Sequence, residues 1–184
     1  SCALEAQNIR ALPESMQFDL CFASERYRVE MPIFGEFNIS NLLGVVGVAL
    51  VKGYELAEVV KLLPQLVPPV GRMQLVSRNG CALAVIDYSH TPDAVKNALL
   101  ALRPVAQARR GKLWIVIGAG GDRDAGKRPM MAEIAERFAD RVLTSDNPRT
   151  EDPQVILGHM LQGLANRQSA YCLSLIHISE PTRP

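Results

Sequence analysis

KLWIVIG at residues 112–118 is an apolar run that predicts a fully buried strand. KRPMMAEIAERFA (127–139) follows as a helix, RVLTS (141–145) as a second strand and DPQVILGHMLQGLA (152–165) as a second helix. Strands that are buried on both faces and separated by helices are typical of a parallel sheet with right-handed crossovers. The sequence therefore predicts an α/β fold with a Rossmann-like, mostly parallel sheet.

The residues just before this region predict a hairpin and a helix. RMQLVSRNGCALAVIDY (72–88) contains two strands joined by a turn at Asn79-Gly80. A helix from Pro92 to about Leu102 follows, with Thr91 as its N-cap.

The first third of the chain has a different pattern. FDLCFASERYRVEMP (18–32) alternates apolar and polar residues and predicts two antiparallel strands. Further on, the pair Pro68-Pro69 predicts a linker. We therefore place a domain boundary there, with one domain over residues 1–68 and another over 69–172.

Two helices are predicted between these strands and the linker. Ser40 or Asn41 is expected to cap a helix over 42–51, which Gly53 ends. A second helix is expected over about 55–63, before a proline.

The two ends of the chain do not fit these patterns. The N-terminus has no basic-then-apolar export signal, and it begins so abruptly that we expect residues upstream of it. Leu173–Arg183 resembles, residue for residue, a translated adapter sequence used in DNA library preparation. We therefore treat 173–184 as a non-native adapter-like tail and assign His177 no role.

Composition excludes several classes of protein. Hydrophobic residues make up 48% of the chain but lie in short runs, none of which reaches the roughly 18 residues that a membrane span needs. The formal net charge is +1, so no overall field favours nucleic acid. The cysteines are scattered without CxxC spacing, which argues against a zinc site or a disulfide framework and fits a reducing cytoplasm. They are Cys2, Cys21, Cys81 and Cys172.

VIDYSHTPDAV (85–95) is the first candidate site. Asp87 and His90 follow a predicted strand and precede a helix, where side chains face the ligand crevice of an α/β fold. The alternative is that the aspartate caps the turn and the histidine is an ordinary loop residue. For Asp-x-x-His alone, that alternative is the stronger interpretation.

GAGGDRDAGKRP (118–129) is the second candidate. Its glycines allow close backbone approach, and Arg123, Lys127 and Arg128 supply charge for a carboxylate or a phosphate. A flexible loop is the alternative. The G-x-G-x-x-G fingerprint is not met, so a dinucleotide site has weak support.

SDNPRTEDP (145–153) is the third candidate. Arg149 is a rigid fork suited to a carboxylate, and Asp146 could receive an ammonium group, so an amino-acid head group would satisfy both. The alternative is an Asx-turn in which Pro148 sets the bend. We expect the three candidate loops to share one edge of the sheet.

Three further features are ambiguous. In GEFNISN (35–41), Asn38 and Asn41 could bind an adenine edge or cap a helix. Arg72 could reach a phosphate across an interdomain cleft, although a lone arginine is more often a solvated surface residue. The pair Met130-Met131 is expected to fill the core.

Taken in order, GEFNISN, GRMQLV, DYSHTPDAV, GAGGDRDAGKRP and SDNPRTEDP resemble the C-terminal part of the Mur ligase family, from about Phe18 to Leu164. The resemblance implies a three-domain ligase of peptidoglycan synthesis. In that family ATP phosphorylates a UDP-linked carboxylate, and the amino group of an incoming amino acid attacks the acyl phosphate to form an amide. Residues 1–68 would then be the C-terminal remnant of the central ATP-binding α/β domain. Residues 69–172 would be the amino-acid-binding domain, truncated.

The resemblance also implies roles for individual residues. The implied ATP-binding residues are Asn38, Asn41, Arg72, Asp87 and His90. The implied amino-acid-binding residues are Arg123, Asp146, Asn147, Pro148 and Arg149. DNPR resembles the tetrapeptide of the relatives that add meso-diaminopimelate, whereas lysine-adding relatives carry another. This choice is physically sensible, because lysine lacks the extra carboxylate and would leave a bidentate arginine unpaired.

Some features of the family are missing from the sequence. It has no G-x-x-x-x-G-K-[ST] loop. The phosphate cradle, the carbamylated lysine that holds Mg²⁺ and the UDP-binding domain are therefore expected upstream. A glycine-rich segment ending in His-Glu is expected beyond Cys172. We accordingly assign no catalytic residue and no metal ligand here, and we expect that the segment does not catalyse ligation alone.

The implied partners are a UDP-linked muramoyl dipeptide, meso-diaminopimelate and ATP with Mg²⁺. The protein itself is expected to be a cytoplasmic monomer. Two alternatives remain. One is a non-catalytic α/β module that binds an amino acid or a nucleotide. The other is a sister ligase that adds glutamate, lysine or a dipeptide, or a folate polyglutamylating relative.

Overall fold

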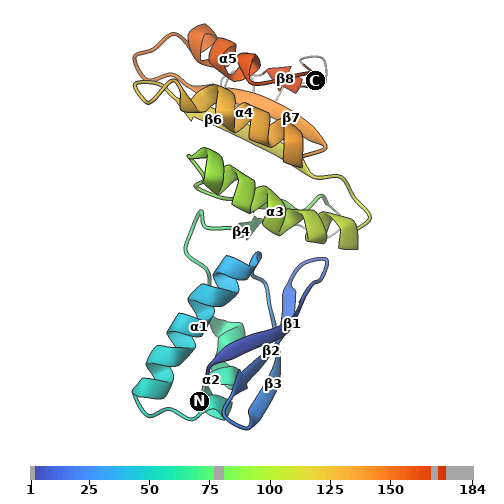
Figure 1. Ribbon diagram of the computed structural model, residues 1–184, viewed down its shortest axis with the longest axis vertical. Helices are drawn as coiled ribbons and strands as arrows, with labels where there is room; N and C mark the ends of the chain where they lie inside the picture. The colour runs from blue at the N-terminus through green and yellow to red at the C-terminus, as the bar shows by residue number, and fades with distance from the viewer. Residues whose placement is uncertain (1–2, 77–80, 167–169, 173–184) are drawn as a thin grey trace. The chain divides into compact units, whose positions relative to one another are not determined.

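The structure is a computed structural model that describes residues 3–76 and 81–166 and the backbone of 170–172. The chain divides into two compact units (Figure 1). The first comprises Ser1–Tyr88 with Pro104–Arg109, and the second comprises Ser89–Arg103 with Arg110–Pro184.

The first unit is built on an antiparallel sheet in the order β1-β2-β3. The strands are β1 (Glu5–Ala11), β2 (Met16–Phe22) and β3 (Glu25–Met31). The hairpin predicted over 18–32 is thus confirmed as β2 and β3. Sequence reasoning missed β1, because its pairing is irregular between Gln7 and Arg10, and this interrupts the alternation that marks a strand.

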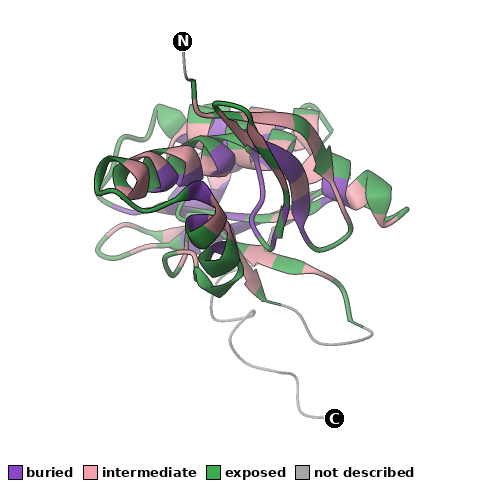
Figure 2. Cartoon of the chain, turned by 90° about the horizontal axis from the view of Figure 1, so that it is seen from below, coloured by how far each residue is buried: buried purple, intermediate pink, exposed green. Residues whose placement is uncertain are grey.

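Two helices and a 3₁₀ turn complete the core of this unit. They are α1 (Glu36–Val51), α2 (Leu56–Leu62) and η1 (Leu63–Gln65). Helix α1 contacts β1, and α2 contacts β3. Phe18 and Leu20 of the central strand are fully buried in this core. Buried residues are coloured purple in Figure 2.

The predicted start of the first helix is wrong. Helix α1 begins six residues earlier than expected, after Gly35, whose φ of 84° is accessible to glycine at little cost. Ser40 lies inside the helix, and its hydroxyl donates to the Glu36 carbonyl at 3.1 Å rather than capping. The predicted end is confirmed, because the helix stops at Val51 and Gly53 takes a φ of 92°.

The prediction for the second helix is confirmed. Helix α2 begins after Glu55, which forms a capping box with Glu58. It passes into η1 at Leu63, next to the proline.

A short hairpin follows, formed by β4 (Gln74–Val76) and β5 (Ala84–Ile86). The two strands pair antiparallel, as predicted, with Leu75 opposite Val85. The predicted turn at Asn79-Gly80 lies outside the described residues. Among the described residues β5 pairs only with β4. A shared edge between the loop after β5 and the parallel sheet stays a prediction.

Helix α3 (Pro92–Ala108) begins as predicted but ends later. The Thr91 hydroxyl accepts from the Ala94 N–H at 3.3 Å, as an N-cap should. The helix continues through Pro104, where the sequence suggested a stop. Burial of Val105, which is 1% exposed, offsets the hydrogen bond that a proline removes.

The second unit contains the predicted parallel sheet, in the order β6-β7-β8. Its strands are β6 (Trp114–Gly120), β7 (Arg141–Asn147) and β8 (Ala170–Cys172). Helices α4 (Lys127–Phe138) and α5 (Pro153–Gln162) pack against each other, and each contacts both β6 and β7. The α/β fold is therefore confirmed.

Methionines 130 and 131 differ in burial. Met131 is 4% exposed and belongs to the core, as predicted, whereas Met130 is 53% exposed. The prediction for Met130 is wrong, because consecutive residues of a helix point in directions about 100° apart and cannot both face one sheet.

Asp140 ties α3 to the amino end of the parallel strands. Its carboxylate accepts from Arg103 at 2.7 Å and from the Leu113 N–H at 2.7 Å. These two bonds lower the pKa of Asp140, the bond from the Leu113 backbone most. The opposite, carboxyl end of the sheet carries two of the candidate loops, 118–129 and 145–153.

Candidate functional site

Two loops meet at the carboxyl ends of β6 and β7. We call residues 121–126 and 148–152 together the loop pair. The Gly121 N–H donates to the Asn147 carbonyl at 2.8 Å. A side chain at Gly121 would overlap the Pro148 carbonyl, so only glycine permits this approach. At this glycine the backbone approaches the neighbouring loop, and close approach of a ligand to the glycines stays a prediction.

A second set of bonds joins the two loops through Asp122. The Thr150 hydroxyl donates to both Asp122 oxygens, at 2.7 and 2.8 Å. The Asp122 N–H in turn donates to the Glu151 carboxylate at 3.2 Å. Asp122 and Arg149 both adopt left-handed backbone conformations, with φ of 55° and 53°. The loop pair therefore has a specific conformation supported by side-chain bonds.

The sequence suggested that Arg128 supplies charge for a ligand. In the structure its charge is paired within the protein instead. Its side chain is 2% exposed and donates to Glu151 in bidentate fashion, at 2.7 and 2.6 Å. It also donates to the Gly120 carbonyl at 3.1 Å and lies 3.0 Å from His159 Nδ1. Sequence reasoning missed this cluster because Glu151 lies 23 residues away, and local patterns carry no signal for such a pair.

The electrostatics of this cluster follow from the ion pair. The Arg128 guanidinium beside Glu151 lowers the pKa of that carboxyl from 4.5 to about 2. The same contact raises the pKa of Arg128. A guanidinium carries only donors, so Arg128 is the donor in its 3.0 Å contact with His159 Nδ1.

The remaining predicted amino-acid-binding residues lie on or beside the loop pair. Arg123 is exposed on one loop and Arg149 on the other. Asn147 is exposed and Pro148 half-buried, whereas Asp146 is 2% exposed at the end of β7. The structure thus presents two guanidinium groups to solvent on loops whose backbones touch, while Asp146 lies within the fold. Recognition of an ammonium group by Asp146 remains a prediction.

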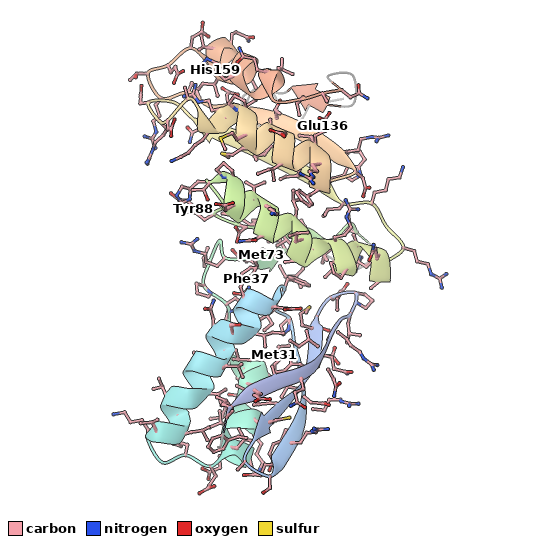
Figure 3. All side chains as sticks on the ribbon, in the orientation of Figure 1. Met31, Phe37, Met73, Tyr88, Glu136 and His159 are labelled. Carbon is pink, nitrogen blue, oxygen red and sulfur yellow. The ribbon has the colours of Figure 1, made fainter. Side chains whose placement is uncertain are left out.

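Four residues implied for ATP binding belong to two places in the first unit. Arg72 lies over the Tyr88 ring, 5.5 Å from its centroid, and the Asp87 carboxylate accepts from the Met73 N–H at 2.9 Å. Both contacts lie at one end of the β4–β5 hairpin (Figure 3). Asn38 lies instead in the first turn of α1.

The α1 residues have local contacts. The Asn38 amide donates to the Phe34 carbonyl at 2.9 Å, and Asn41 is exposed on the helix. His90 is exposed and belongs to the second unit.

Residues 3–76 and 81–166 contain no group of three or more His, Cys, Asp or Glu side chains arranged to hold a metal ion. None of the helices in the described part of the chain is both long and apolar enough to span a bilayer.

Comparison with known proteins identifies the family. Residues 71–179 match the sequence profile of the Mur ligase, glutamate ligase domain. Two curated relatives are both named UDP-N-acetylmuramoyl-L-alanyl-D-glutamate–2,6-diaminopimelate ligase. The protein of Ralstonia nicotianae is 48% identical over 91% of this chain and 33% of its own length. That of Pseudomonas aeruginosa is 54% identical over 73% of this chain and 27% of its own.

A solved structure of a 2,6-diaminopimelate ligase of the same name is 35% identical, with a TM-score of 0.65. It covers 92% of this chain and 34% of its own. The chain thus spans about a third of the length of the relatives it matches. The profile match covers more than half of the 184 residues, and the chain therefore belongs to the Mur ligase family.

Proposed function

We propose that this chain is the amino-acid-binding part of an ATP-dependent ligase of peptidoglycan synthesis. The ligase would add meso-diaminopimelate to UDP-N-acetylmuramoyl-L-alanyl-D-glutamate. The names of the relatives support this substrate pair. Free thiols at Cys21 and Cys81 are compatible with a cytoplasmic site of action.

The observation that carries the proposal is the exposed Arg149 on a loop that Asp122 and Glu151 support from both sides. A guanidinium offers two parallel N–H groups that match a carboxylate. Meso-diaminopimelate carries one carboxylate more than lysine, so it would satisfy this fork and lysine would not. Arg123 on the adjacent loop would add a second positive charge, and Asn147, Pro148 and Asp146 would shape the same pocket.

The nucleotide would bind through other residues of the chain. The exposed guanidinium of Arg72 suits a phosphate. Asp87 is half-buried and flanks the same end of the β4–β5 hairpin as Arg72. Asn38, Asn41 and His90 complete the proposed set. ATP with Mg²⁺ would supply the phosphoryl group that activates the acceptor carboxylate. We assign the metal ligands to no residue of this chain.

Calorimetric titration of the chain with meso-diaminopimelate and with lysine tests the proposal. A charge-assisted hydrogen bond contributes about 1.5–3 kcal/mol, so the preference for diaminopimelate should be at least roughly tenfold. Arg149→Ala should abolish this preference.

The matched control is Arg110→Ala. Arg110 is also exposed and also has a left-handed backbone, with a φ of 52°, but it lies outside the loop pair. This variant should keep the preference. Equal binding of both amino acids by the unsubstituted chain would contradict the proposed function.

A further inference from the structure

Arg128 is the largest of the fully buried side chains in the described part of the chain. Arginine is rarely fully buried unless it is paired, yet this one is 2% exposed in the first turn of α4. Its position therefore depends on the partners that surround it.

Those partners come from three elements. The guanidinium contacts the Gly120 carbonyl at the end of β6, the Glu151 carboxylate in the loop pair and His159 on α5. A bidentate pair constrains direction as well as distance. Arg128 thus fixes the Glu151 side chain relative to the strand and the helices.

Glu151 passes this constraint to the backbone on which Arg149 lies. The Glu151 carboxylate also accepts from the Asp122 N–H at 3.2 Å, and its own N–H donates to the Pro148 carbonyl at 2.9 Å. Arg149 lies inside the turn that this last bond closes. Its left-handed φ of 53° is uncommon for a residue other than glycine, and this conformation requires support from the surrounding structure.

We infer that Arg128 is a positioning residue for amino-acid selection: through Glu151 it holds the 148–151 turn so that the Arg149 fork meets the second carboxylate of the amino acid. This inference rests on the proposed function. It predicts that the ion pair controls discrimination between diaminopimelate and lysine rather than binding of the head group that the two share.

The test compares Glu151→Gln and Arg128→Lys with the unsubstituted chain. Glu151→Gln keeps the shape of the side chain and removes its charge, and Arg128→Lys keeps the charge and removes the bidentate fork. Glu136→Gln is the matched control, because this α4 carboxylate accepts from the Ala165 and Asn166 N–H groups at 2.8 Å and lies outside the loop pair. Circular dichroism establishes that each variant is folded.

The first measurement is the ratio of the lysine and diaminopimelate dissociation constants. A charge-assisted bond is lost when the fork is misplaced, so the ratio should fall roughly tenfold in Glu151→Gln while the lysine constant stays within about twofold. Glu136→Gln should leave the ratio unchanged. A Glu151→Gln chain that keeps the full ratio would overturn the inference.

The second measurement is amide hydrogen exchange of residues 147–151, compared with residues 114–118 of β6. Exchange at the turn should accelerate in Glu151→Gln and remain slow in the strand. Unchanged exchange at the turn would also overturn the inference. If the unsubstituted chain shows no preference for diaminopimelate, the proposed function fails, and the exchange result still decides whether the ion pair holds the turn.

Discussion

Two arginine–carboxylate pairs, one in each unit, have opposite patterns of burial. On the antiparallel sheet, the side chain of Asp19 is 5% exposed and that of its partner Arg28 is 68% exposed. Beside the loop pair, Arg128 of α4 is 2% exposed and its partner Glu151 is 25% exposed. The first pair therefore has its cation in water, whereas the second has its cation in the protein interior.

The consequence lies in what remains when the cation is removed. Asp19 also accepts from the Asn8 amide at 2.8 Å, so it keeps a donor without Arg28. Without Arg128, Glu151 loses a bidentate donor, and the Gly120 carbonyl and His159 each lose theirs. The two ion pairs have similar distances, but removing the cation should affect stability and the site more for Arg128 than for Arg28.

Replacing Arg128 with methionine should have the largest effect on stability. The change leaves buried acceptors without their donor, and breaking a buried pair costs about 3 kcal/mol. The free energy of unfolding, measured by urea titration with circular dichroism, should fall by roughly this amount. A variant as stable as the unsubstituted chain would show that the cluster is not a buried network.

Lowering the pH should weaken the Arg128–Glu151 pair in a defined window. The folded-state pKa of Glu151 is about 2, below its ordinary 4.5, so the unfolded chain takes up the proton first as the pH falls. The stability that this carboxylate contributes is present above about pH 4.5 and is lost as the pH approaches 2.

The measurement is the difference in the free energy of unfolding between the unsubstituted chain and Glu151→Gln across this range. The difference should shrink as the pH falls. Asp19→Asn is the comparison on the other sheet, because bonds from Arg28 and Asn8 lower the pKa of Asp19 from its ordinary 3.8. A difference for Glu151→Gln that stays constant with pH would contradict the assigned ion pair.

Replacing Arg28 with methionine should have the smallest effect. The guanidinium is mostly solvated, and surface ion pairs contribute little to stability. The urea midpoint should move far less than in Arg128→Met. A comparable shift in the two variants would remove the distinction between the regions.

Much of the fold could be predicted from local patterns. Strands β6 and β7, helices α4 and α5, and the β2–β3 hairpin all follow from runs and alternations of a few residues. Predictions failed where tertiary contacts override such patterns. Burial of Val105 carries α3 past Pro104, and the irregular β1–β2 pairing hides β1.

The candidate site was predictable only in part. The positions of Arg123 and Arg149 after parallel strands indicated a shared rim, and both are exposed on the loop pair. The pattern could not separate these arginines from Arg128, because all three lie in polar loops or at a helix start. Glu151 and Asp122 appeared only as acidic residues of those loops.

The sequence by itself determined the order of strands and helices from β2 to α5, the turns that glycine permits and the family, since each of these depends on neighbouring residues or on motifs in a row. Only the tertiary structure decided that Arg128 is buried and Arg149 exposed, and that Glu151 joins them. Burial depends on which distant segments pack around a side chain, and no short stretch of sequence contains that information.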